Sequence, residues 1–358
     1  MQRTKPIAKI LLCLSAAALA AAVAACSAWT PQGGNERETP FTRTRTELLG
    51  TVITISVYDK APSDAELEAL LARCFLEIEA AEARMSVNRA DSEISAVNNA
   101  AGDGPVRVSE ELYRLIARAK DISEMSDGAF DVTVGPVTAL WKTDGAFARL
   151  PSEEEIRERL PLVGSGGIGL AAPDGISLAA RGMALDAGGI AKGYACDSVV
   201  AVLREGGIRH AVLDFGGNVY VLGTKPDGSD WRVGIRLPLM GESGVVCVVD
   251  AADISAVTSG GYERFFERDG AVYHHLLNPE TGYPAQSGLL SATVLSPSST
   301  DADGLSTACF VLGLEKGMSL LAENGLDGVF ISEARRIYAT EGLRGRIRVT
   351  DGRFSLSD

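Results

Sequence analysis

The sequence predicts an α+β fold in which helices pack on mixed or antiparallel sheets, within a single large two-lobed domain. Two observations lead to this prediction. Helical periodicity is frequent in the first half of the chain, and Asp-Gly turns between apolar runs recur in the second half. With 46% hydrophobic residues among 358, the chain has enough apolar material for a large core.

The first elements can be placed from local signals. Apolar and β-branched residues alternate over 48–58, which predicts a strand. Ser63 and Glu66 form a capping box that begins an amphipathic helix. A second helix begins at Ser109 and is ended by Gly128.

Later elements follow the same signals. Ser152 caps a short charged helix, residues 190–203 have helical spacing, and Ser299 or Thr300 caps another helix. Asp-Gly pairs between apolar runs predict hairpins at 174–175, 227–228 and 269–270.

The N-terminus has the pattern of a secretory leader over residues 1–25. A positive front precedes an apolar run that is shorter than the roughly 20 residues of a membrane-spanning helix. The stretch 23-VAAC-26 resembles a bacterial lipobox, in which Cys26 would become the lipidated first residue. A plain secretory leader is the alternative. We expect a lipoprotein signal peptide at 1–25, a flexible tether at 26–42 and the folded domain at 43–358.

Charge and cysteine content exclude some classes of protein. The formal net charge of −13 disfavours nucleic-acid binding, which needs clustered Lys and Arg. The cysteines after Cys26 match no metal-binding or redox spacing, and each lies among apolar residues, which predicts buried thiols. The three histidines are too few for a histidine-rich zinc site.

One glycine pattern is misleading. Residues 164-GSGGIG-169 match the dinucleotide-binding pattern G-x-G-x-x-G. That motif needs a buried strand before it and a helix after it, but only three apolar residues precede the match and Pro173 follows. We therefore interpret it as a chance match in a glycine-rich loop.

Two acidic loops are candidates for ligand binding. Asp131 is the only charged side chain in 128-GAFDVTVGP-136, although an aspartate after a helix often caps its own backbone. In 186-DAGGIAKGYACD-197, the glycines leave the backbone open to a ligand, and Lys192 lies in the first turn of a helix, where anions are favoured. A tight connection with a solvated lysine is the alternative.

A third segment, 298-SSTDADGLSTACFVLG-313, supplies oxygen ligands. Asp303 and Thr307 lie one helical turn apart on one face, and such hard oxygen atoms suit Mg²⁺. The more common role of such an acid is as an exposed residue of the first turn that interacts with the helix dipole. His274 and His275 are adjacent on a predicted strand and would point to opposite faces.

Together these segments resemble the ApbE family of bacterial FAD:protein FMN transferases over about residues 48–313. The resemblance implies a T-fold-like architecture and Mg²⁺-dependent transfer of FMN from FAD to a threonine hydroxyl of a membrane flavoprotein subunit, with release of AMP. A lipid attached at Cys26 would fit this reaction, because it would hold the protein at the periplasmic or extracytoplasmic face of the cell membrane. The segments that carry it are 85-MSVNRADSEISAVN-98, 128-GAFDVTVGP-136, 186-DAGGIAKGYACD-197, 214-DFGGNV-219, 257-VTSGGYER-264, 275-HLLNPETGYP-284 and 302-ADGLSTACFVLG-313.

The resemblance also implies roles for individual residues. The ligands of Mg²⁺ would be the backbone carbonyl of Gly189 and the side chains of Asp303 and Thr307. We expect His275 to accept the hydroxyl proton, since imidazole titrates near neutral pH, with Asp303 as the second candidate base. The residues that would contact FAD are Leu49, Asn88, Ala129, Phe130, Asp131, Asp186, Lys192 and His274.

Two alternatives to the transferase remain open at this point. With water in place of threonine, the same groups would make an Mg²⁺-dependent FAD pyrophosphatase that releases FMN and AMP. A non-catalytic flavin-binding lipoprotein is the second alternative, and it would not need the Asp303 and Thr307 pair.

Overall fold

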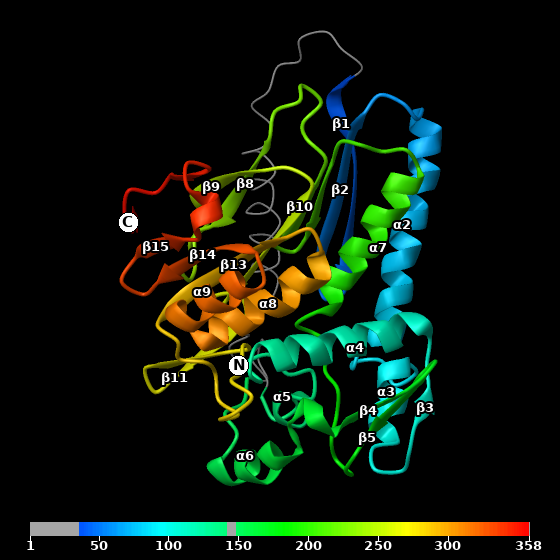
Figure 1. The fold of residues 1–358 in the computed structure, drawn as a ribbon, viewed down its shortest axis with the longest axis vertical. Helices are drawn as coiled ribbons and strands as arrows, with labels where there is room; N and C mark the ends of the chain where they lie inside the picture. Colours follow the sequence, from blue (N-terminus) through cyan, green and yellow to red (C-terminus); the bar gives the residue numbers. More distant parts are fainter. Residues whose placement is uncertain (1–35, 142–147, 358) are drawn as a thin grey trace, which may run out of the picture.

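The computed structural model describes residues 36–141 and 148–357, and among these a nine-stranded sheet forms the centre (Figure 1). Neighbouring strands are antiparallel, except for the last pair, which is parallel. In spatial order the strands are β1 (Glu36–Leu48), β2 (Thr51–Asp59), β6 (Ala211–Phe215), β7 (Asn218–Leu222), β10 (Ile254–Gly260), β13 (Leu289–Ser296), β14 (Asp327–Ser332), β15 (Arg336–Ala339) and β17 (Ser355–Leu356).

Helices cover one face of this sheet. The long helices α2 and α7 lie side by side, and α8 packs against α7 and against strands β10 and β13 (Figure 1). The helices of the described residues are α2 (Asp64–Met85), α3 (Glu93–Asn99), α4 (Glu110–Met125), α5 (Gly135–Thr138), α6 (Glu153–Arg159), α7 (Ala191–Glu205), α8 (Ser299–Leu312) and α9 (Leu314–Glu323), with short 3₁₀ turns η3 (Leu160–Leu162), η4 (Ser165–Gly167) and η5 (Glu341–Leu343).

Both faces of the large sheet are apolar. Successive side chains along a strand point to opposite faces, so neighbouring apolar residues belong to different cores. On β14, Phe330 lies in the core beneath the helices, whereas Val329 and Ile331 belong to a second core on the other face. That second core is covered by a three-stranded sheet of β16 (Ile347–Val349), β9 (Val245–Ala251) and β8 (Trp231–Arg236). The molecule is therefore layered as helices, large sheet and small sheet.

Two further small sheets lie beside these layers. One contains β3 (Val106–Arg107), β5 (Gly175–Leu178) and β4 (Ile168–Ala171), and it lies with α3 and α4 in the lower part of Figure 1. The other is the hairpin of β11 (Phe265–Arg268) and β12 (Ala271–His274). The α+β class with mixed and antiparallel sheets is thus confirmed.

Local capping signals placed the starts of α2, α4 and α6 correctly. Ser63 and Glu66 form a complete capping box at α2, and Ser152 forms a second one with Glu155 at α6. Ser109 accepts a hydrogen bond from the backbone of Leu112 at the start of α4. The predicted hairpins at 174–175 and 269–270 are also present, as β4–β5 and β11–β12. The cysteines after Cys26 are buried free thiols, as expected (Cys74, Cys196, Cys247 and Cys309).

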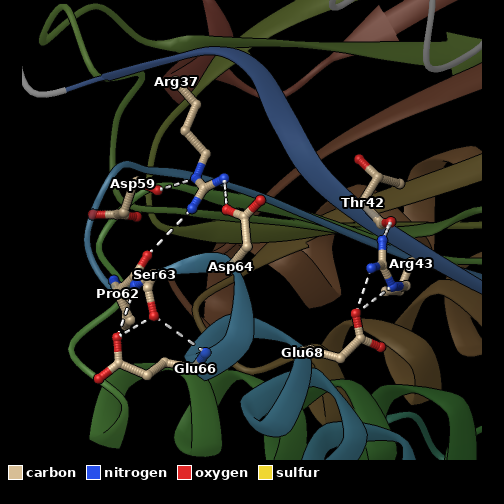
Figure 2. A network of polar contacts seen from close by, with 9 residues as sticks. All are labelled: Arg37, Thr42, Arg43, Asp59, Pro62, Ser63, Asp64, Glu66 and Glu68. Atoms are coloured by element: carbon tan, nitrogen blue, oxygen red, sulfur yellow. Dashed lines mark hydrogen bonds and ion pairs between the residues drawn. The ribbon is translucent and has the colours of Figure 1, made fainter.

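The prediction of a flexible tether is wrong for residues 36–42, which belong to strand β1. Arg37 donates to the carbonyl oxygen of Asp59 at 2.8 Å and pairs with Asp64 of α2, while Arg43 pairs with Glu68 (Figure 2). Polar and charged residues of this stretch suggested a solvated linker, but here they hold an edge strand against α2.

Two smaller predictions also need correction. The Asp-Gly pair at 227–228 does not close a hairpin, because β7 and β8 on either side of it belong to different sheets. Helix α8 is capped by Ser298, whose hydroxyl accepts from the backbone of Asp301, and not by Ser299 or Thr300.

The predicted signal peptide and Cys26 lie outside the described residues. Within 36–141 and 148–357, no helix has the length and apolar character needed to cross a membrane.

Candidate functional site

The two predicted acidic loops lie side by side. The backbone N–H of Asp186 donates to the carbonyl oxygen of Val132 at 2.7 Å, and Val134 forms a bridge with Ala184. The Asp186 carboxylate accepts from the Thr138 hydroxyl at 2.8 Å and from the backbone of Gly188 at 2.9 Å. These bonds fix the glycine loop 187–189 against the segment that follows α4.

Asp131 is 7% exposed, and both of its carboxylate oxygens are bonded inside the protein. One oxygen accepts from the backbone and the hydroxyl of Thr133, at 2.8 and 2.6 Å, and the other accepts from the backbone of Ser165 at 2.8 Å. Asp131 therefore holds the turn at 164–167 in place. Its neighbours Ala129 and Phe130 are buried as well.

The stretch 164-GSGGIG-169 does not have the strand–turn–helix context of a dinucleotide-binding motif. It forms the short turn η4 and runs directly into strand β4, and no helix opens after it. The backbone N–H groups of a helix start, which would bind a pyrophosphate in that motif, are absent from this stretch of the described chain.

Gly189 lies where the glycine loop meets α8. A Cβ atom added at Gly189 would come within 3.2 Å of the Phe130 ring and 3.6 Å of the Thr307 hydroxyl oxygen. The backbone of Gly189 is therefore close to both side chains, and a larger residue would press on them. This contact brings residues from all three predicted segments to one place.

The ammonium group of Lys192 faces the carboxylate of Asp303, with 3.4 Å between Nζ and Oδ1. The other oxygen of Asp303 accepts from the backbone N–H of Gly193 at 2.9 Å. Ile190 supplies no side-chain cap to α7, so the start of this helix is held by a carboxylate from α8 instead. The start of α7 thus combines a lysine, a buried acid and bare glycine backbone.

Asp303 differs from the simple expectation of an exposed first-turn acid. It is the fifth residue of α8, in the second turn, and only 3% of it is exposed. The first-turn acid is Asp301, which pairs with Arg118 at 2.7 Å. Asp303 is buried because α7 crosses α8 at this point.

Thr307 lies one turn after Asp303, as the spacing predicted. Its hydroxyl lies 3.3 Å from the hydroxyl of Ser259 on β10 and 3.4 Å from the carbonyl oxygen of Asp303. The Asp303 carboxylate and the Thr307 hydroxyl are both held by neighbouring elements, so their oxygen atoms have fixed positions on α8.

The two adjacent histidines have different surroundings. His274 ends strand β12, and its ring packs edge-on against Phe310 of α8 while Nε2 lies 3.1 Å from the carbonyl oxygen of Ala285. His275 follows the strand, and its Nδ1 lies 3.3 Å from the carbonyl oxygen of Arg264. Burial and, to a smaller extent, the nearby Arg264 guanidinium lower the pKa of His275 to about 3. The lowered pKa argues against the expectation that this imidazole titrates near neutral pH.

Leu49 and Asn88 lie at the same end of α2. The backbone N–H of Leu49, in the turn between β1 and β2, donates to Glu82 of α2 at 3.2 Å. Asn88 is exposed in the loop that follows α2, and its backbone donates to the Ser86 hydroxyl at 3.3 Å. Within the described chain, neither residue forms a hydrogen bond with another predicted site residue.

Three polar residues close to Asp303, Thr307 or Lys192 were given no role from the sequence. Ser259 contacts Thr307, and Asp197 of α7 binds the start of α8. Burial raises the pKa of Glu263, and the charges of Lys192 and nearby arginines oppose that shift. All three lie in segments that had been singled out, but the long-range partners that give them a role were not visible in the sequence.

A cavity of about 860 Å³ lies apart from these groups, between α6 and the turn at 281–283. It is lined by residues such as Ile156, Leu160 and Tyr283, none of which is a predicted site residue. We therefore define the site by the chemistry of its side chains and not by the size of a cavity.

The fold and the side chains that meet at the start of α7 indicate which class of ligand this protein binds. A lysine and bare glycine backbone at a helix start suit a phosphate group, and a carboxylate with a hydroxyl suits a hard divalent cation. An α+β protein with this set is suited to bind a nucleotide. The chain belongs to the ApbE family, since the model of that family matches residues 49–330.

Relatives and solved structures agree with this assignment. The FAD:protein FMN transferase of Treponema pallidum (strain Nichols) is 40% identical over 339 residues, which cover 90% of this chain and 93% of the relative. The enzyme of the same name from Klebsiella pneumoniae (strain 342) is 36% identical over 313 residues, 87% of this chain and 95% of the relative.

Among solved structures, the apo form of the flavinyl transferase ApbE from Pseudomonas stutzeri superposes with a TM-score of 0.76 at 29% identity. The match covers 88% of this chain and 98% of that one. The ApbE protein from Thermotoga maritima gives a TM-score of 0.78 at 30% identity, over 86% of this chain and 99% of that one.

Proposed function

We propose that this chain transfers FMN from FAD to a threonine hydroxyl of a partner protein, in an Mg²⁺-dependent reaction that releases AMP. The observation that carries the proposal is the meeting of three segments: Gly189 lies against Phe130 and Thr307, and Lys192 faces Asp303. The relatives named as FAD:protein FMN transferases support the choice of reaction.

The oxygen atoms present fit Mg²⁺. The Asp303 carboxylate and the Thr307 hydroxyl lie one turn apart on α8, and the backbone of Gly189 approaches Thr307 closely enough that a Cβ would lie 3.6 Å from its hydroxyl. Hard oxygen ligands of this kind, completed by phosphate oxygens of a substrate, are typical of Mg²⁺ sites. When bound, the ion supplies positive charge that stabilises the pyrophosphate oxygens and the departing phosphate.

In the proposed step, the threonine oxygen forms a bond to the phosphorus of the FMN half of FAD. The bond from that phosphorus to the bridging oxygen breaks, and AMP leaves with the bridging oxygen and its electron pair. The proton of the threonine hydroxyl passes to a base. Lys192 binds phosphate oxygens and balances their charge from the start of α7.

The surroundings of His275 do not suit the role of base, because its pKa is lowered to about 3. A neutral imidazole with so low a pKa is a weak proton acceptor at neutral pH. Asp303 is the second candidate for this role.

The test of the proposal is transfer to a defined acceptor. The purified chain, FAD and Mg²⁺ are expected to add FMN to a flavoprotein subunit that carries an acceptor threonine, as measured by intact-protein mass spectrometry. The adduct is expected to disappear with EDTA or when the acceptor threonine is replaced by alanine. Binding of NAD without any response to FAD, or an unmodified acceptor under all conditions, would contradict the proposal.

The two alternatives predict other products. A pyrophosphatase would release free FMN and AMP from FAD and Mg²⁺ at the same rate with or without the acceptor. A flavin-binding lipoprotein without catalysis would bind FAD and release neither product. Chromatography of the nucleotides in the same reactions separates the three outcomes.

Lipid attachment at Cys26 is a separate proposal, based on 23-VAAC-26 after a short apolar run. It would hold the enzyme at the outer face of the cell membrane, near membrane redox subunits as acceptors. Cys26→Ser is expected to move the protein from the membrane fraction to the soluble fraction after cell fractionation, because the acyl chains provide the anchor. Retention of Cys26→Ser in the membrane at the level of the unchanged protein would rule out this anchor.

A further inference from the structure

Asp197 of α7 binds the first residues of α8 with both of its carboxylate oxygens. Oδ1 accepts from the backbone of Ser299 at 2.7 Å. Oδ2 accepts from the backbone of Thr300 at 2.9 Å, from the Thr300 hydroxyl at 2.6 Å and from the Ser298 hydroxyl at 3.2 Å. The first two backbone N–H groups of α8 are thus satisfied by a neighbouring helix, while its own cap, Ser298, serves the third at Asp301.

The same two helices meet again one turn further along. The backbone N–H of Gly193 donates to Asp303 at 2.9 Å, and a Cβ at Gly193 would lie 2.2 Å from the carbonyl oxygen of Ser299. Gly193 and Asp197 are four residues apart on α7, and Ser299 and Asp303 are four residues apart on α8. Each pair therefore lies on one face of its helix, and hydrogen bonds join the two faces at two positions that are one helical turn apart.

From this arrangement we propose that Asp197 is a positioning residue for the active site. It fixes α8 along its axis relative to α7, and so sets the distance from Asp303 and Thr307 to Gly189 and Lys192. A shift of α8 by one residue corresponds to about 1.5 Å, which is enough to separate metal ligands that come from different helices.

The hydroxyl contacts of α8 on the sheet side are weaker than its contacts with Asp197. On the sheet side, the Ser255 hydroxyl lies 2.9 Å from that of Ser299, and the Ser259 hydroxyl lies 2.9 Å from that of Ser306. These are bonds between neutral groups, whereas the bonds to Asp197 are charge-assisted and about twice as strong. Of the charged contacts at the start of α8, Asp301 with Arg118 joins α8 to α4, whereas Asp197 joins α8 to the helix that carries Lys192.

The experiment compares Asp197→Asn with Asp301→Asn. Both variants remove one negative charge at the start of α8, but Asp301 is bonded to Arg118 of α4 and does not link α8 to α7. In Asp197→Asn an NH₂ group replaces one carboxylate oxygen and cannot accept a hydrogen bond. The donors at the start of α8 that faced that oxygen would then lose their acceptor. Three quantities are measured for each protein: the Kd of FAD with and without Mg²⁺ by calorimetry, kcat and KM for FMN transfer, and Tm.

For Asp197→Asn we expect the Kd of FAD in the presence of Mg²⁺ to rise about tenfold and kcat to fall by about 10- to 100-fold, as for residues that orient metal ligands. The Kd of FAD without Mg²⁺ is expected to change less, and a high Mg²⁺ concentration is expected to restore part of kcat. Asp301→Asn is expected to stay within about twofold of the unchanged protein, because it leaves the joined helix faces intact.

Two results would overturn the inference. If Asp197→Asn lowers only Tm and leaves the Mg²⁺-dependent Kd and kcat unchanged, Asp197 has a purely structural role. If Asp301→Asn has the same effect as Asp197→Asn, the cause is the helix dipole and not the link between the helices. If Asp197→Asn does not fold, Thr300→Val takes its place, since it removes one hydroxyl bond to Asp197, and unchanged Mg²⁺-dependent binding in that variant also overturns the inference.

The positioning role rests on the proposed function, yet the two can fail separately. An unmodified acceptor with the unchanged protein contradicts FMN transfer. The Mg²⁺-dependent Kd of FAD tests the position of α8 without any turnover.

Discussion

Asp303→Ala is expected to lower the rate of FMN transfer by at least about 100-fold, because the loss of a proposed direct Mg²⁺ ligand should exceed the 10- to 100-fold loss that is typical when a residue that only orients the ligands is removed. The alanine also leaves the Gly193 N–H and the Lys192 ammonium without their acceptor, so the free energy of unfolding is expected to fall by about 1–3 kcal/mol. This cost is larger than the sequence suggested, since Asp303 is 3% exposed. The measurements are initial rates across an Mg²⁺ titration and urea unfolding.

Thr307→Ala is the comparison for this variant. Its hydroxyl is neutral and its neighbours Ser259 and the Asp303 carbonyl are weakly bonded to it, at 3.3 and 3.4 Å, so a loss of only about tenfold is expected. Asp303→Asn keeps the shape of the side chain and serves if the alanine variant is unfolded. Normal turnover of either Asp303 variant at low Mg²⁺ would place the ion elsewhere.

Gly193→Ala is expected to destabilise the protein by about 3 kcal/mol, at the upper end of the cost of overpacking. The added Cβ would lie 2.2 Å from the Ser299 carbonyl oxygen and 2.8 Å from Cβ of Asp303. The carbonyl oxygen is a backbone atom, so the clash is relieved only if α7 and α8 separate. Urea unfolding measures the loss, and FMN transfer at a temperature where the variant is folded is expected to fall as well.

Gly304→Ala is a matched control on the partner helix. A Cβ at Gly304 would lie 2.8 Å from Cδ1 of Ile122, which is the flexible end of a side chain and can move. Alanine also has a higher helix propensity than glycine by about 1 kcal/mol, so the net change is expected to stay within about 1 kcal/mol. Equal stability of Gly193→Ala and the unchanged protein would show that the two helices are not held at this distance.

Local signals in the sequence were sufficient for much of the fold. Ser63 with Glu66 located the start of α2, Ser152 located α6, and alternation located β2. Such signals act between residues three or four apart, so they depend little on the rest of the chain. The tether prediction failed at residues 36–42 because the charges that hold β1 belong to the distant helix α2.

Several residues of the candidate site could be predicted from the sequence. The burial and bonding partners of those residues could not. The spacing of Asp303 and Thr307 on one face of a helix is a property of the helix itself. The pKa of His275, in contrast, depends on burial and on Arg264 beside it, and neither can be read from the two adjacent histidines. The same limit applies to Asp131, whose carboxylate is used by the turn at Ser165.

The sequence by itself determined several helix starts, much of the strand pattern and the three segments that meet in the candidate site. The tertiary structure decided which of them are buried and what each one bonds. Asp197 and Ser299 are 102 residues apart, and Gly193 and Asp303 are 110 apart. Contacts at such separations form only when α7 and α8 pack on the same sheet, and many other carboxylates of the chain satisfy the same local rules. Packing therefore selected the partners, and with them the position of the site.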